Sequence, residues 1–217
     1  MSGDTPIRIV HYFDYKSPYA YLAEEETRRV ERDLGVVFDS IPYTLDIPSY
    51  LGRAEVDDRG HVISEERTGH QWRRVRYAYM DCRREAARRG LVIRGPRKIF
   101  DSSLAHVGFL WARRHGDPRP YHDAVFERFW RRELDLESVD AIEAALESSG
   151  VPAGGFRDFL AGDGRVEHDR IRADAEARGV FGVPSYLIGD ELFWGNERIG
   201  RVRERIEAAL GRGARSP

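Results

Sequence analysis

A basic stretch in the middle of the sequence has the chemistry to accept an anion. Residues 67–98 carry eleven Arg or Lys against only two acidic residues. Arg76 and Tyr79 stand one helical turn apart, and Arg97 follows a Gly–Pro pair. Guanidinium groups bind carboxylates through charge-assisted hydrogen bonds. Arg76 and Arg97, together with Tyr79, are therefore candidates to hold a carboxylate substrate. A solvated helix face stays open as an alternative. Nucleic-acid binding also stays open, although the expected lack of exposed stacking platforms disfavours it.

The single cysteine, Cys82, limits the redox and metal chemistry of the chain. One Cys excludes an internal disulfide, a CxxC redox pair and a Cys-based zinc site. The seven His show no HxxH or HExxH spacing, so no metal cofactor is predicted. Cys82 falls on the apolar stripe of a predicted helix, with Tyr79 and Ala86, which favours a buried structural thiol over a nucleophile.

Charge and hydropathy narrow the class of protein. The 35 basic and 37 acidic residues give a net charge of −2, which argues against general binding to nucleic acid or membrane surfaces. Hydrophobic residues make up 41% of the chain, which excludes wholesale disorder. No secretory signal and no long apolar run is evident. We expect a cytoplasmic protein that acts on a small-molecule substrate.

The N-terminal residues predict a strand–helix–strand unit. The strand Ile7–Phe13 is apolar on both faces, as in a central strand covered on both sides. Ser17 is placed to cap the following helix, and Pro18 to occupy its first position. That helix stops at Gly35, and a second strand follows from Val36. This arrangement is the parallel crossover module.

The C-terminal residues predict a strand–strand–helix unit. Residues 185–188 and 191–194 form two short strands, and Gly189–Asp190 between them suits a two-residue hairpin turn. A helix is expected from Asn196 to Leu210.

The intervening residues predict helices. Helical segments are expected at 72–90, from 101 or 102, from 118 or 120, from Asp135, and at 152–160 and 166–178. Together with the two terminal units, they predict an α/β protein with a thioredoxin-like fold and an all-helical insertion. The predicted division is a discontinuous thioredoxin-like domain, 1–50 and 180–211, and an insertion domain, 51–179.

Two terminal motifs carry a family resemblance. The segment Phe13–Ala23 resembles the first motif of the 2-hydroxychromene-2-carboxylate isomerases and kappa-class glutathione transferases, which share a DsbA-like arrangement of the thioredoxin fold. Residues 179–185 and 193–198 resemble their last motif. The basic helix, with Arg76–Tyr77 and a later Gly90, is similar to their first insertion helix.

The resemblance gives Ser17 a chemical role. Ser17 occupies the position of the reactive Cys of thioredoxin-like proteins, at a helix N-terminus whose partial positive charge stabilises a thiolate. The implied role is to donate a hydrogen bond to the thiolate of a bound thiol, and helix capping alone is the alternative. The Val183–Pro184 bond is expected to be cis and to pair with the backbone of that thiol like an added strand.

The resemblance also implies the remaining site residues. Asn196 and Glu197 are expected to hold the γ-glutamyl end of glutathione, or helix capping is their whole role. Tyr19 is a further candidate to contact the substrate. The cofactor is expected to be glutathione or another low-molecular-weight thiol.

Together these features favour a thiol-dependent isomerase that acts on an unsaturated aromatic carboxylate by reversible thiolate addition. A kappa-class-like transferase or other detoxifying enzyme is an alternative on the same site. A redox-silent thioredoxin-like binding protein is a third hypothesis.

Runs of large apolar residues suggest a homodimer. Phe109, Leu110 and Trp111 are consecutive, as are Phe129 and Trp130. Consecutive helix positions point about 100° apart, so we expect some of these side chains to remain uncovered by one chain. Uncovered aromatics mark an association surface, and the resembling family is dimeric.

Overall fold

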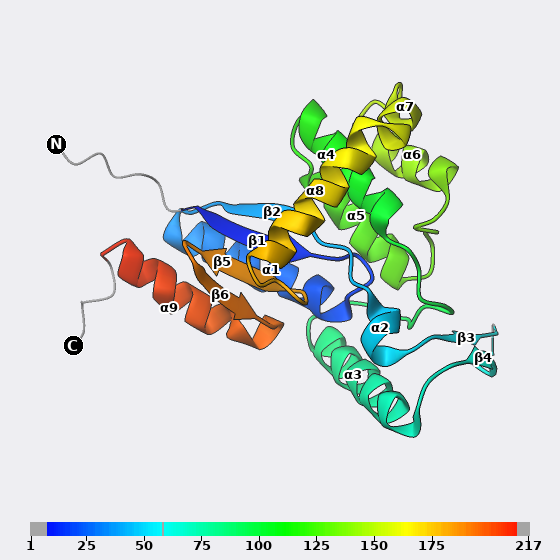
Figure 1. Ribbon diagram of the computed structural model, residues 1–217. Helices are drawn as coiled ribbons and strands as arrows, with labels where there is room; N and C mark the ends of the chain where they lie inside the picture. The colour runs from blue at the N-terminus through cyan, green and yellow to red at the C-terminus, as the bar shows by residue number, and fades with distance from the viewer. Residues whose placement is uncertain (1–7, 58, 212–217) are drawn as a thin grey trace.

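The order of helices and strands follows the sequence pattern closely (Figure 1). The computed structural model describes residues 8–57 and 59–211, so Ile7 lies outside the described residues. The elements are β1 (Ile9–Phe13), α1 (Pro18–Leu34), β2 (Phe38–Pro42), α2 (Ile47–Leu51), β3 (Ala54–Val56), β4 (Val62–Glu65), α3 (Gly69–Arg88), α4 (Ser103–His115), α5 (Arg119–Trp130), α6 (Val139–Ser148), α7 (Phe156–Ala161), α8 (Asp163–Ala177), β5 (Ser185–Ile188), β6 (Glu191–Trp194), the 3-10 turn η1 (Asn196–Arg198) and α9 (Ile199–Ala209).

The main sheet has the order β2-β1-β5-β6, with β1 and β5 in the middle. β1 pairs parallel with β2 and antiparallel with β5, and β5 pairs antiparallel with β6. All five residues of β1 are buried, as expected for a central strand. The parallel pair requires a crossover, and α1 supplies it.

Local sequence signals fix both ends of α1. The Ser17 hydroxyl accepts a hydrogen bond from the Ala20 N–H, which satisfies one of the free donors of the first turn. Pro18 has no N–H to satisfy there. At the other end, Gly35 adopts a φ of 64°, the left-handed conformation that ends helices. Ser17 is therefore held at a defined helix N-terminus.

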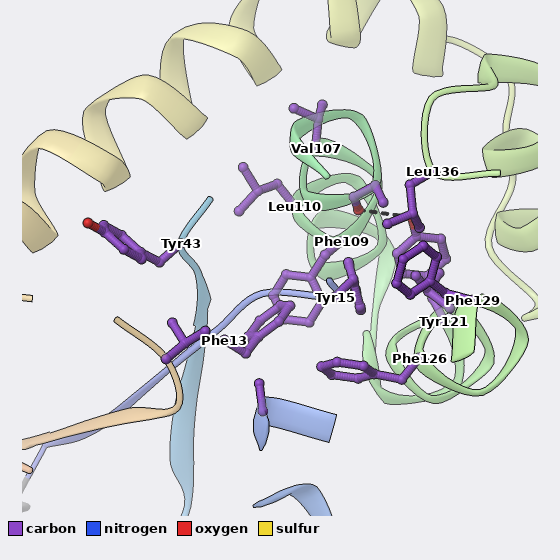
Figure 2. Packing of buried hydrophobic residues seen from close by; sticks show 14 of the residues in the cluster. Phe13, Tyr15, Tyr43, Val107, Phe109, Leu110, Tyr121, Phe126, Phe129 and Leu136 are labelled. Atoms are coloured by element: carbon purple, nitrogen blue, oxygen red, sulfur yellow. Dashed lines mark hydrogen bonds between the residues drawn. The ribbon is translucent and has the colours of Figure 1, made fainter. Parts of the chain in front are cut away.

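Helices α1 and α9 cover one face of the main sheet. A compact apolar cluster joins them to β1, β2 and β5 through Ile9, Val30, Leu34, Phe38, Tyr186, Ile188, Val202 and Ile206. The sheet and the helical part share a second, larger core. There Phe13 meets Phe109 with ring centroids 5.0 Å apart, and Tyr15 meets Phe126 at 4.9 Å (Figure 2).

The insertion is helical except for a two-stranded antiparallel sheet, β3–β4. It lies in the polar stretch after residue 51, where every residue of β4 is exposed and gives no hydrophobic alternation. The start of α6 also differs from expectation. Ser138, rather than Asp135, is its N-cap, because the Ser138 hydroxyl accepts the Ala141 N–H at 3.3 Å.

The expectation that large apolar side chains of the insertion remain uncovered by one chain was wrong. Phe109, Leu110, Phe129 and Trp130 are all buried within the single chain, because α4 packs against α5, α6, α7 and α8. Trp111 is partly buried and donates its indole N–H to the Pro152 carbonyl. The expected dimer therefore depends on the resemblance alone.

Among the described residues, no helix combines the length and the apolar character needed to span a bilayer.

Candidate functional site

A large cleft opens beside the N-terminus of α1. Its volume is about 1180 Å³, and its walls come from α1, α2, the β3–β4 hairpin, α3, the loop 95–100 and the segment 181–183. Ser17, Val183, Tyr19, Arg76, Tyr79 and Arg97 all line it. The fold thus brings together six of the nine predicted site residues, from segments far apart in the sequence.

Ser17 and Val183 meet directly. The Ser17 hydroxyl donates to the Val183 carbonyl across a long 3.4 Å contact, and the peptide bond between Val183 and Pro184 is cis. The Pro184 carbonyl accepts the Gly195 N–H, so the segment is anchored to the end of β6. The single hydroxyl proton of Ser17 is therefore free to turn from a weak internal acceptor to a better one in the cleft.

Asp14 holds the turn that carries Ser17. Its carboxylate is completely buried. One oxygen accepts the Leu45 N–H at 2.8 Å, and the other accepts the Ser102 hydroxyl at 2.6 Å and the Lys16 N–H at 3.0 Å. These bonds join the β1–α1 turn to the chain after β2 and to the start of α4.

Lys16 places a buried ammonium directly before Ser17. Its Nζ lies 3.4 Å from an Asp14 oxygen and donates to the Ser102 hydroxyl at 3.3 Å. Burial alone would raise the pKa of Asp14, but the Lys16 ammonium and the contacts with His106 and Ser102 outweigh it and hold the pKa well below its usual range. Asp14 is therefore ionised, and Lys16 keeps its counter-ion.

A polar chain continues from Asp14 toward the surface. His106 Nε2 lies 3.4 Å from Asp14, and Thr44 Oγ1 bridges His106 Nδ1 at 2.7 Å and His168 Nε2 at 2.8 Å. Burial lowers the pKa of His106, and it lowers the pKa of His168 to about 4. Both rings are neutral at pH 7 and tie α4 and α8 to the loop after β2.

Helix α3 forms an aromatic and cationic wall. The Arg76 guanidinium lies over the Trp72 ring at 5.6 Å, and the Arg83 guanidinium lies over the Tyr79 ring at 5.8 Å. Burial raises the pKa of Tyr79 to about 12, so it is a neutral phenol. The β3–β4 hairpin is tied to the loop with Arg97, whose carbonyl accepts the Val56 N–H.

Tyr19 presents its ring to the cleft, but its hydroxyl is engaged. It donates to Asp81 at 3.1 Å. Burial is the main cause that raises the pKa of Tyr19, with Cys82 and Asp81 adding to it. Tyr19 therefore offers an apolar face, rather than a free donor, to a ligand.

Asn196 and Glu197 do not line the cleft. They lie in η1, where the Glu197 side chain is 65% exposed and 3.9 Å from Arg198. A Cβ at Gly195 would lie 2.6 Å from a Glu197 oxygen, so Gly195 allows this carboxylate to fold back over the backbone. The Glu197 carboxylate therefore lies over Gly195 and outside the lining of the cleft, and its predicted contact with a γ-glutamyl group stays a prediction.

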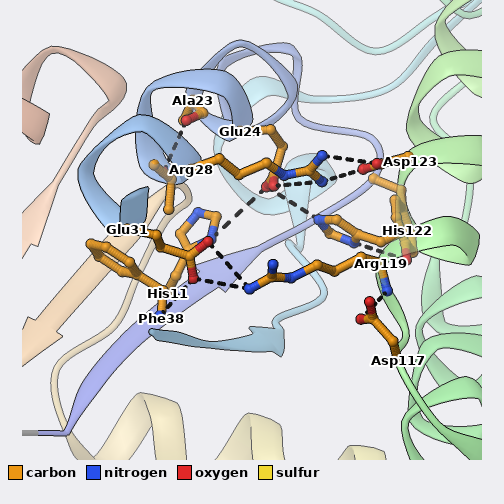
Figure 3. Close-up of polar contacts among 12 residues, drawn as sticks. His11, Ala23, Glu24, Arg28, Glu31, Phe38, Asp117, Arg119, His122 and Asp123 are labelled. Atoms are coloured by element: carbon orange, nitrogen blue, oxygen red, sulfur yellow. Dashed lines mark hydrogen bonds and ion pairs between the residues drawn. The ribbon is translucent and has the colours of Figure 1, made fainter. Parts of the chain in front are cut away.

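A second polar cavity of about 430 Å³, here called the cavity behind β1, is lined by residues of β1, β2, α1, α4 and α5. The arginine side chains in it are paired with carboxylates. Arg28 pairs with Asp123, and Arg119 lies 3.3 Å from Glu31 (Figure 3). His122 lies 3.2 Å from Glu24 and 3.2 Å from the Tyr15 hydroxyl. Because its cations already have carboxylate partners, we assign the functional site to the larger cleft.

No group of three or more His, Cys, Asp or Glu in the described part of the chain is arranged to hold a metal ion.

The chain belongs to the DSBA-like thioredoxin domain family, whose model matches residues 8–207. It is 29% identical over 206 residues to the 2-hydroxychromene-2-carboxylate isomerase of Pseudomonas putida, and the match covers 93% of both chains. It is 27% identical to the enzyme of the same name from Sphingobium xenophagum, over 87% of this chain and 92% of that one. These relatives support an isomerase.

The solved structures show the same fold. A 2-hydroxychromene-2-carboxylate isomerase structure superposes with a TM-score of 0.69 at 24% identity, over 94% of both chains. The DsbA of Pseudomonas aeruginosa superposes with a TM-score of 0.56 at 16% identity, over 97% of this chain and 89% of that chain. The expected DsbA-like fold and family are thus confirmed.

Sequence reasoning missed several cleft residues. Lys16 lines the cleft, and its position directly before Ser17 is the sequence signal that could have found it. Arg83 continues the row of Arg76 and Tyr79, so helical spacing was available to find it. Arg132 comes from a distant turn and hydrogen-bonds the Gly95 carbonyl at 2.8 Å, a contact with no sequence signal.

We expect Asp14→Asn to lower the free energy of unfolding by about 3–5 kcal/mol at neutral pH, because it leaves the Lys16 ammonium buried without its partner. The folded-state pKa of Asp14 lies below its ordinary value of 3.8, so its contribution is fully present above about pH 5. That contribution disappears as the pH falls through the folded-state value. Urea denaturation from pH 3 to pH 8 measures the full contribution at neutral pH and the beginning of its decline below the ordinary carboxyl pKa.

The exposed Asp174→Asn is the matched control and should be neutral. A gap between wild type and Asp14→Asn that stays constant down to pH 3 would contradict the ionised state of Asp14.

Cys82 should be inert in the native protein. Its side chain is buried, and burial raises its pKa to about 12, so almost no thiolate is present at pH 8. We expect slow reaction with a chromogenic disulfide reagent in buffer, fast reaction in guanidinium, and no reduction of insulin disulfides or oxidation of dithiols. Rapid labelling of the folded protein would show that the thiol is accessible.

Proposed function

We propose that the protein is a thiol-dependent isomerase that acts on an unsaturated aromatic carboxylate in the large cleft. The observation that carries this proposal is the pairing of Ser17 with Val183 at the N-terminus of α1, in a cleft lined by cationic and aromatic side chains. The isomerase names of the relatives support the same reaction class.

The residues around Ser17 suit a thiol cofactor, glutathione or another small thiol. The hydroxyl donor and the positive end of α1 both favour a negative charge at this point. When bound, the thiol supplies the nucleophile that adds reversibly to an unsaturated carbon. Val183 and Pro184 form the extended edge against which a peptide-like thiol pairs.

The chain's own residues bind and orient the thiol and the substrate. Ser17 donates a hydrogen bond from its hydroxyl to the sulfur, while Asp14 fixes the turn and keeps Lys16 in place. Arg76 and Arg97 hold the carboxylate of the substrate. The rings of Tyr19 and Tyr79 contact its aromatic part and exclude water from it.

Asn196 and Glu197 remain candidates for the amino-acid end of the thiol. In this proposal Glu197 swings away from Gly195 to reach an ammonium group. A thiol without a γ-glutamyl group has no need of this contact, so comparing glutathione with simpler thiols tests their role.

Two other functions lead to different outcomes in the same assay. A kappa-class-like transferase consumes the thiol, whereas an isomerase returns it unchanged. A redox-silent binding protein binds without turnover. Following the thiol concentration and the substrate spectrum together separates the three.

We expect Ser17→Ala to lower kcat/KM by about ten- to hundred-fold at saturating thiol, because a hydrogen bond to a charged group contributes about 1.5–3 kcal/mol. Loss of the cap should lower stability by about 1 kcal/mol. Ser138→Ala is the matched control, because Ser138 caps α6 with the same geometry but lies outside the cleft. Equal activity of Ser17→Ala and wild type would remove Ser17 from the mechanism.

We also infer a homodimer, on the family resemblance alone, since twofold closure is the commonest oligomeric arrangement. Light scattering at micromolar concentration should give twice the chain mass of 24.9 kDa. A mass of one chain that does not change with concentration would exclude the dimer.

A further inference from the structure

The lining of the large cleft carries charge of one sign. Eight cationic residues contribute to it, and no Asp or Glu does among the described residues: Lys16, Arg67, Arg74, Arg76, Arg83, Arg97, Lys98 and Arg132. The whole chain is nearly neutral, so this is a local concentration of positive charge. Such a cleft focuses its field on an anionic ligand.

Much of this charge has no carboxylate partner among the described residues. Lys16 pairs with Asp14, and Lys98 pairs with Glu137. Within residues 8–57 and 59–211, no carboxylate lies within ion-pair distance of Arg74, Arg76 or Arg83. This contrasts with the balanced cavity behind β1. The unpaired guanidinium groups are therefore available to a ligand.

The guanidinium groups gather at two places along α3. Near its start, Arg76 and Arg67 both lie over the Trp72 ring, at 5.6 Å and 5.0 Å. Seven residues further on, Arg83 and Arg132 meet beside Gly95. Seven residues are two helical turns, or about 10 Å along the helix axis.

Tyr79 lies between these two places, one helical turn from Arg76 and one from Arg83. Its ring is packed against Gly95, where an added Cβ would lie 3.4 Å from the ring edge. The Arg76 guanidinium lies over the Trp72 ring and the Arg83 guanidinium over the Tyr79 ring. Two cations spaced along a row of aromatic rings suit a flat, conjugated ligand with a negative group at each end.

We propose that the cleft binds an elongated, conjugated dianion, with one anionic group at Arg76 and the other at Arg83. This inference rests on the proposed function for the identity of the cleft, and it deepens it. The substrate would carry a second anionic group beyond the single carboxylate that the reaction requires. The volume of about 1180 Å³ exceeds the usual range of roughly 300–1,000 Å³ for small-molecule pockets, so it leaves room for such a ligand.

Isothermal titration calorimetry with three probes tests the proposal without thiol or turnover. The probes are a linear biphenyl with a carboxylate at each end, the same biphenyl with one carboxylate, and phthalate, whose carboxylates are adjacent. We expect the linear dicarboxylate to bind at least about tenfold more tightly than either of the others, since a charge-assisted hydrogen bond is worth that factor.

Arg76→Gln and Arg83→Gln should each abolish the advantage of the dicarboxylate over the monocarboxylate. Arg73→Gln and Arg84→Gln are the matched controls, because these residues lie exposed on the same helix and do not line the cleft. Each of the four changes removes the same charge.

Equal affinities for the two biphenyl probes would overturn the proposal, and so would no measurable binding of any probe. An equal loss in the control variants would overturn it as well, because it would show general electrostatic attraction. A failed isomerase assay with an intact dicarboxylate preference would count against the proposed reaction alone. A working isomerase assay without a dicarboxylate preference would count against the proposed dianionic ligand alone.

Discussion

The buried carboxylate of Asp14 is the group on which the arrangement of the cleft depends. It accepts hydrogen bonds from three separate parts of the chain, the β1–α1 turn, the segment after β2 and the start of α4. A buried charge is tolerated only when it is paired and hydrogen-bonded, and Lys16 supplies the pairing. Through these bonds the sheet, the helical insertion and the N-terminus of α1 are fixed relative to one another.

The two cavities differ in whether their cationic side chains have carboxylate partners. Behind β1, each guanidinium has a carboxylate beside it, so the network contributes to structure and has little charge left for a ligand. In the large cleft, carboxylates are absent from the described lining, and the guanidinium groups of Arg67, Arg76 and Arg83 lie over aromatic rings. Guanidinium groups without a described carboxylate partner, such as those of Arg76 and Arg83, around an apolar surface are the chemistry of an anion site.

The sequence was informative where a signal is local. Ser17, Pro18 and Gly35 mark the two ends of α1, and the Gly189–Asp190 turn marks the hairpin of β5 and β6. It was less informative where burial depends on several neighbours at once. Phe109 and Leu110 point in different directions from α4, and both are buried because helices surround α4 on several sides.

The same distinction applies to the candidate site, where local motifs predict some residues and contacts between distant segments determine the others. The motifs around Ser17 and Val183 predicted that both residues belong to one site, and the structure brings them into direct contact. The role of Lys16 depends on Ser102, which is 86 residues away, and no spacing rule links them. The β3–β4 hairpin, which forms part of the cleft wall, has exposed strands without apolar alternation, so periodicity could not reveal it.

The most direct test of the account is a crystal structure of the protein with glutathione. The account predicts the sulfur within hydrogen-bond distance of the Ser17 hydroxyl, the cysteinyl backbone paired with Val183, and the ligand inside the cleft formed by α1 and α3. A thiol bound in the cavity behind β1, or a cleft that stays empty at saturating glutathione and at saturating concentrations of simpler thiols, would contradict it.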